Sequence, residues 1–177
     1  MSFTVRQISD AIAASFGQSG PAADAIFARV KGAAQTGLLG HAATPGAGRP
    51  RRLELGEAAF ACCLQVLRDY GVERGPAMEI RPGFHVAALP ETLAAIREGE
   101  DFDLALAFVH IIAPGQPVRA GIRAAWCRPI TLPDWSPYEP ETRGRPALGN
   151  VHTAFVARWP ISATLCPFLH CLEPDDQ

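Results

Sequence analysis

The chain has 177 residues, of which 48% are hydrophobic and 19% charged, and its formal net charge is −2. This length and composition allow one ordinary domain or two small ones with a real core, which excludes wholesale disorder. The sequence shows no secretory signal, no uncharged apolar run of about 18 residues and no disulfide spacing among its five cysteines. We therefore expect a soluble cytoplasmic protein with no membrane partner.

Three helices are predicted in the first part of the chain. Apolar residues at helical spacing predict the first over residues 4–16. The second opens at the Ser19-Gly20-Pro21 step, with Ser19 as the expected N-cap, and ends at Gly37. The third covers about residues 56–70, where Gly71 is expected to supply the C-terminal cap.

The second part of the chain has a different pattern. Residues 72–88 are ambiguous, and a short helix is predicted from Pro90 to Gly99. Apolar residues alternate over 102–108, which predicts a strand, and the turn signal at 113–117 leads to a returning strand over 118–126. We expect a long loop over 129–149, another strand over 151–159 and an apolar segment of uncertain type to residue 172.

A basic, Gly/Pro-rich stretch, "HAATPGAGRPRRL" at residues 41–53, separates the second and third predicted helices. The order of two short helices, a hairpin of this kind and a third helix is typical of a winged helix-turn-helix. A short helix fits the DNA major groove, whereas arginines on a wing neutralise phosphates and release counterions. We therefore expect Arg49, Arg51 and Arg52 to contact DNA, although a solvated loop remains the alternative.

Four motifs over residues 3–71 resemble the DNA-binding domain of the MerR-type winged helix-turn-helix superfamily. They are "FTVRQISDAI", "KGAAQTGLL", "GRPRRLEL" and "LRDYGV". On the family pattern, Lys31 matches the arginine of the recognition helix and Arg52 matches the wing arginine. Leu53 stands where the family usually has an aromatic residue, and Glu54 replaces the usual Ser or Thr N-cap. No coiled-coil pattern follows these motifs.

The predicted helices and strands, together with this resemblance, imply an α+β fold in which a winged-helix DNA-binding domain occupies residues 1–73. A small α+β domain with an antiparallel hairpin would occupy residues 76–177. Residues 1–75 have eight basic and six acidic side chains, whereas residues 76–177 have eight basic and twelve acidic ones. A basic DNA-binding part joined to an acidic companion fits this asymmetry. The companion would dimerise the protein, sense a small-molecule effector or bind a partner protein.

We therefore predict a sequence-specific DNA-binding protein of the bacterial nucleoid, most simply a dimeric transcription regulator that binds double-stranded DNA. The expected DNA contacts are Arg29, Lys31, Arg49, Arg51 and Arg52. One alternative is a phage-derived architectural or packaging DNA-binding protein. Another is a protein-interaction module whose winged helix has lost DNA binding.

Two chemical alternatives are weaker in the sequence. Thiolates and imidazole are zinc ligands, but the spacing of Cys127, Cys166, His170 and Cys171 is not that of paired ligands. An enzyme would need a cysteine nucleophile with a base, for which the candidates are His85, His110 and His152. No neighbouring residue activates a thiol, so we expect no enzyme, metal or cofactor. Of the adjacent Cys62 and Cys63, we expect one in the core and one more exposed.

Overall fold

The computed structural model describes residues 2–40, 52–112, 115, 117, 119–129, 131 and 150–172. These residues form a mixed α+β fold, as predicted, with six helices and two small antiparallel sheets. The helices are α1 (Val5–Ser15), α2 (Pro21–Gln35), α3 (Leu55–Asp69), α4 (Arg74–Ala87), α5 (Pro90–Arg97) and α6 (Ile161–Leu172). The strands are β1 (Ser2–Thr4), β2 (Arg52–Glu54), β3 (Asp103–Ile112), β4 (Arg119–Cys127) and β5 (Asn150–Trp159). None of the described helices is long and apolar enough to cross a membrane.

The smaller sheet joins the start of the chain to the segment that precedes α3. β1 pairs antiparallel with β2, so that Phe3 lies opposite Leu53, and both side chains are buried. Thr4 then begins α1 with a capping box, because its hydroxyl accepts the Gln7 N–H and the Gln7 side chain accepts the Thr4 N–H. The strand pair thereby fixes the position at which the chain returns after residue 51.

The structure contradicts the predicted N-cap of α2 and confirms the predicted C-terminal cap of α3. The N-cap of α2 is Gly20, which has no side chain to bond the free amides, so the prediction of Ser19 as the cap is wrong. Gly71 does end α3, with φ +78°. The Gly71 N–H bonds the Arg68 carbonyl and the Val72 N–H bonds the Leu67 carbonyl, which is a Schellman motif.

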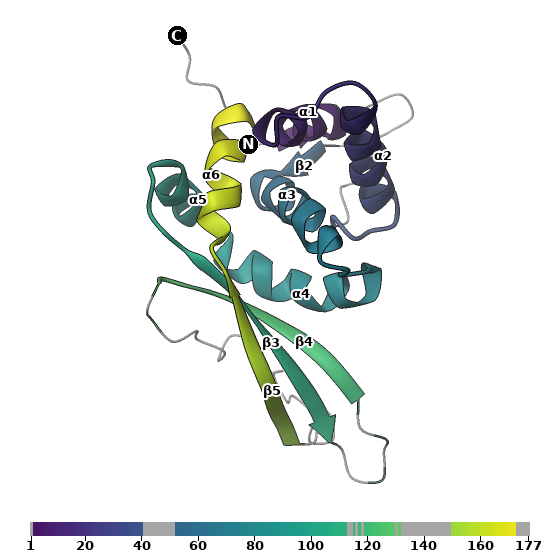
Figure 1. Ribbon diagram of the computed structural model, residues 1–177, viewed down its shortest axis with the longest axis vertical. Coiled ribbons are helices and arrows are strands. Elements are labelled where there is room, and N and C mark those ends of the chain that lie inside the picture. Colours follow the sequence, from purple (N-terminus) through teal and green to yellow (C-terminus); the bar gives the residue numbers. More distant parts are fainter. Residues whose placement is uncertain are drawn as a thin grey trace.

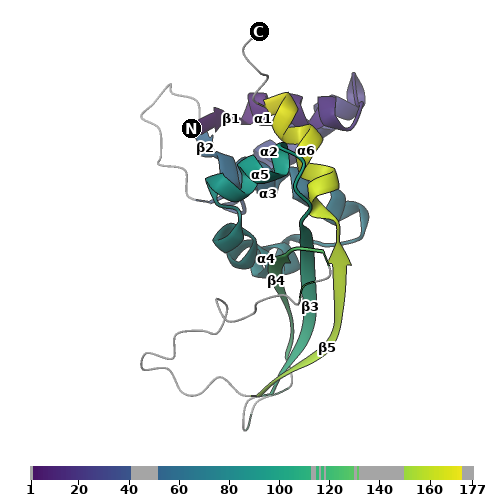
Figure 2. The same cartoon turned by 90° about the vertical axis from the view of Figure 1, so that its left-hand side faces the viewer.

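The larger sheet has the strand order β4-β3-β5, and it extends away from the helices (Figures 1 and 2). β3 and β4 form the predicted antiparallel hairpin, with Leu106 opposite Ala124. β5 pairs antiparallel with the other side of β3. One face of the sheet packs on α4, where the Trp126 ring meets Phe84 edge-on at a centroid distance of 4.9 Å.

One continuous hydrophobic core runs from the first helices to the larger sheet. Phe84 of α4 lies at its centre, because its ring contacts Trp126 on one side and Phe60 of α3, at 5.1 Å, on the other. At the far end of the chain, α6 packs against α1, α3 and α5 (Figure 1). The predicted division between residues 73 and 76 therefore does not coincide with a break in this core.

Prolines lie inside the two helices that the sequence left undecided. α4 contains Pro82 and α6 contains Pro167, and each of these residues removes a backbone donor. Both helices persist because they bury apolar faces, in which Phe84 and Phe168 are fully buried.

The prediction that one of the adjacent Cys62 and Cys63 is more exposed is wrong. Both cysteines lie in the core, and burial raises the pKa of each thiol well above its usual range.

Candidate nucleic-acid interface

Helices α1 and α2 pack against each other across the short connection at residues 16–20. Two glycines in this connection, Gly17 and Gly20, have positive φ, a conformation that other residues adopt at a cost. The Arg6 guanidinium of α1 lies 5.3 Å from the centre of the Phe27 ring of α2 and pairs with Asp10 at 3.0 Å. The Arg6 guanidinium is therefore occupied by contacts within the protein. The side of α2 that faces away from Phe27 is exposed to solvent.

The open side of α2 is partly lined by small residues. The helix buries Ile26, Val30 and the two alanines that follow them, and it exposes Ala25 and Ala28 on the other side. With 3.6 residues per turn, Gly32 follows Ala28 along the same face. Asp24 and Gln35, four residues before and seven residues after Ala28, are exposed on the same side, so the small residues line only part of this face.

Two of the predicted DNA contacts lie on opposite flanks of this open face. Arg29 and Lys31 are both exposed, and residues two apart on a helix point about 200° away from each other. Among the described residues, no acidic side chain forms an ion pair with either of them. The structure thus places an exposed cation on each side of α2 but does not bring the two cations together.

The predicted wing arginines are only partly described. Arg49 and Arg51 lie outside the described residues. Arg52 is exposed at the start of β2, but its Nε donates to the Ser2 hydroxyl at 3.1 Å and one Nη donates to the Ser2 carbonyl at 2.8 Å. Arg52 therefore holds the β1–β2 pair together, and only the remaining donors of its guanidinium can reach a ligand.

Two further arginines lie beside α2, and the sequence analysis missed both of them. Arg68 lies in the last turn of α3, and its pKa is lowered by burial and then by the nearby positive charge of Arg29. Arg74 begins α4 and donates from Nη2 to the Thr36 carbonyl at the end of α2, at 3.0 Å. In the sequence these residues belong to other helices, and only tertiary packing brings them to α2.

A half-buried ion pair supports the chain where it leaves α2. The Glu57 carboxylate of α3 accepts from Arg81 of α4 at 2.8 Å, and its other oxygen lies 3.4 Å from His85 Nε2. Burial raises the pKa of Glu57, but His85 and Arg81 together outweigh that effect and hold the pKa below its usual value. The Gly40 backbone lies so close to this pair that a side chain there would overlap it.

The hypothetical zinc ligands lie in different surroundings. Cys166 and His170 of α6 both face the Arg97 carbonyl at the end of α5, at 3.9 and 3.1 Å. Cys127 lies on β4, where its sulfur accepts from Arg158 at 3.0 Å. In the part of the chain that the structure describes, no group of three or more His, Cys, Asp or Glu side chains could hold a metal ion.

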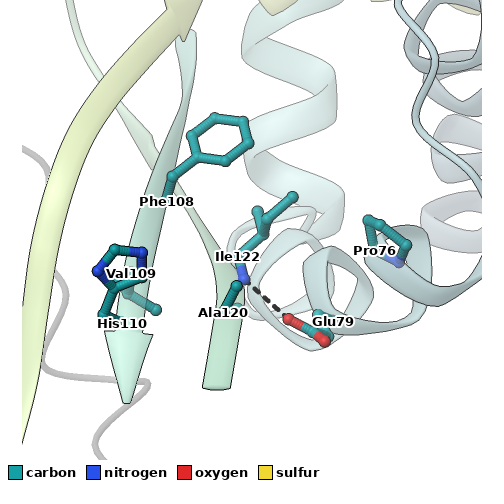
Figure 3. A pocket seen from close by; sticks show the side chains of 8 residues that line it. Pro76, Glu79, Phe108, Val109, His110, Ala120 and Ile122 are labelled. Atoms are coloured by element: carbon teal, nitrogen blue, oxygen red, sulfur yellow. Dashed lines mark hydrogen bonds between the residues drawn. The ribbon is translucent and has the colours of Figure 1, made fainter. Parts of the chain in front are cut away.

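A pocket of about 340 Å³ between α4 and the sheet contains one of the histidines considered as a catalytic base (Figure 3). His110 lies at this pocket, whose floor is apolar and includes Phe108 and Ile122. Glu79 enters from α4, but its carboxylate already accepts the Ile122 N–H at 2.8 Å. No cysteine or serine lines the pocket, so among the described residues His110 has no nucleophile beside it there.

In comparisons with protein-family models, curated proteins and solved structures, the chain has no match. The resemblance to the MerR-type superfamily thus rests on its four sequence motifs and stays a prediction.

Proposed function

We propose that the protein binds double-stranded DNA through α2 and the basic stretch at residues 41–53, as a dimeric transcription regulator of the nucleoid. The observation that supports this proposal most is the pair of exposed cations, Arg29 and Lys31, on the two flanks of a helix face that contains Ala25, Ala28 and Gly32. A helix is roughly 10–12 Å across with its side chains, and the major groove is about 12 Å wide. A helix lying in that groove therefore has a phosphate backbone on each side, where these cations would bind.

The winged helix-turn-helix interpretation is supported by the order of the elements. α1 and α2 are joined by a short, glycine-containing connection, and β2 begins within the last two residues of the basic stretch. β1 and β2 form a strand pair at the base of that stretch. In this arrangement, Arg49 and Arg51 would reach a neighbouring phosphate or the minor groove.

The small residues of α2 also favour a second candidate, a less discriminating architectural DNA-binding protein. Ala28 can contact a thymine methyl group and Gln35, which is exposed, can bond adenine, but alanine and glycine donate no side-chain hydrogen bond to a base. On either flank of α2 a cation is better placed for phosphate than for base edges. Lys31, matched by resemblance to a recognition residue, would then contribute affinity more than sequence preference.

Titration of a duplex of random sequence at several salt concentrations tests DNA binding. Counterion release gives a log–log salt slope of about −0.9 for each phosphate contact. We expect Arg29→Ala with Lys31→Ala to flatten the slope by about two units, and Arg49→Ala with Arg51→Ala to do the same. Arg123→Ala, on the sheet, is the matched control. Arg52 is left intact because its loss would also disturb β1.

Thermal melts of each variant serve as the folding control, since exposed cations contribute little to stability. No salt-dependent binding by the folded wild-type protein would contradict the proposal and favour a protein-interaction module. Selection from random DNA separates the two DNA-binding candidates. A regulator enriches one sequence, whereas an architectural protein enriches none.

A further inference from the structure

Three arginines from three different helices lie along one side of α2. Arg29 and Thr36 are seven residues apart, so they lie on the same side of the helix and about 10 Å apart along it. Arg74 reaches the Thr36 carbonyl, and Arg68 lies close enough to Arg29 for the two charges to repel. We call Arg29, Arg68 and Arg74 the arginine cluster.

The arginine cluster lacks neutralising partners among the described residues. Asp69 and Glu73 are near in sequence, yet neither forms an ion pair with any of the three arginines. Holding like charges together is unfavourable in the free protein, and Arg68 is also partly withdrawn from water. An anion between the guanidinium groups would remove this repulsion, and phosphate matches the planar fork of an arginine.

We propose that the arginine cluster binds successive phosphates of one DNA strand alongside α2. This inference rests on the proposed function, and it adds Arg68 and Arg74 to the DNA contacts. Lys31 would face the opposite strand across the groove, so α2 would be held more strongly at the side of α3 and α4. The C-terminal end of α3 and the start of α4 thereby become part of the DNA-binding surface.

The test is a titration of the full chain with a 25-base-pair duplex of random sequence at several salt concentrations. We expect Arg68→Ala to lower affinity roughly fivefold to twentyfold and to flatten the salt slope by about one unit. Arg68→Lys should recover most of the slope, because it restores the charge, but less of the affinity, because it lacks the fork. Arg74→Ala should behave like Arg68→Ala, and Arg123→Ala should match the wild-type protein.

The outcomes separate the inference from the proposed function. If the wild-type protein binds DNA and Arg29→Ala weakens binding, while Arg68→Ala and Arg74→Ala match Arg123→Ala, the inference is wrong and the proposed function stands. If the folded wild-type protein shows no salt-dependent DNA binding, the proposed function fails and the inference fails with it. Should Arg74→Ala melt early through loss of its bond to Thr36, Arg68→Ala and Arg68→Lys still decide the matter.

Discussion

Gly40 tests how tightly the chain beyond α2 is coupled to the Glu57–Arg81 pair. Gly40 has φ +85°, and an added Cβ would overlap the Glu57 carboxylate and lie 2.8 Å from Arg81 Nη2. Gly71 is a matched control, because it has φ +78° and open space around it. Replacing either glycine with alanine imposes the same left-handed backbone strain, but only Gly40→Ala also displaces the ion pair.

The expected magnitudes follow from these two contributions. Left-handed backbone strain costs about 1–2 kcal/mol for a residue with a Cβ. Breaking a buried ion pair costs about 3–5 kcal/mol, and we reduce this to roughly 1–3 kcal/mol because both side chains retain some exposure. Gly71→Ala should therefore lose about 1–2 kcal/mol, and Gly40→Ala about 2–5 kcal/mol. For a chain of this size, each kcal/mol lowers Tm by about 2–4 °C.

Urea unfolding followed by circular dichroism gives both free energies of unfolding. The decisive comparison repeats Gly40→Ala in a Glu57→Ala background, where the carboxylate that the new methyl group would strike is absent. The excess cost of Gly40→Ala over Gly71→Ala should then largely disappear. Equal losses for the two single variants, or an excess that survives Glu57→Ala, would refute the coupling.

Three further predictions concern the carboxylate, the core and the assembly. Because the folded pKa of Glu57 lies below its usual value of 4.5, its stabilising contribution is present above that value and is lost as pH falls through the folded pKa. Urea unfolding between pH 6 and 3 should therefore show that the free energy of unfolding declines less steeply in Glu57→Gln than in the wild-type protein. Phe84→Ala should lose about 3–5 kcal/mol in the same assay, with a single transition in near- and far-UV circular dichroism if helices and sheet share one core; two separate transitions would contradict this. The full chain should sediment as a homodimer at micromolar concentration, and a monomer would count against the predicted dimer.

Local signals in the sequence were sufficient where the deciding interactions are local. Thr4 and Gln7 are three residues apart and start α1 themselves, and the period of two in residues 102–108 marks β3. Pro82 obscured α4, since a proline normally interrupts a helix. The burial of Phe84 between α3 and the sheet stabilises α4, and no pattern within residues 72–88 reveals that partner.

The candidate site also contains some residues that the sequence could place and others that only tertiary packing places. The sequence analysis placed the expected DNA contacts Arg29 and Lys31 on the second helix, and the structure exposes both of them on α2. The position of Arg68 beside Arg29 depends on how α3 packs against α2, and the bonds of Arg52 to Ser2 depend on strand pairing across 50 residues of sequence. Single-sequence patterns do not contain such tertiary information.

The packing of α6 on α1 has a consequence for how the protein is made. These helices are separated by about 150 residues of chain, so their contact raises the contact order and slows folding. During synthesis, α1 leaves the ribosome many seconds before α6, at typical rates of about 5–20 residues per second. Until then, the α1 surface that α6 covers has no partner, and a nascent chain is exposed to aggregation or chaperone capture. The helices proposed to bind DNA would therefore reach their finished form only after residues 161–172 have been translated.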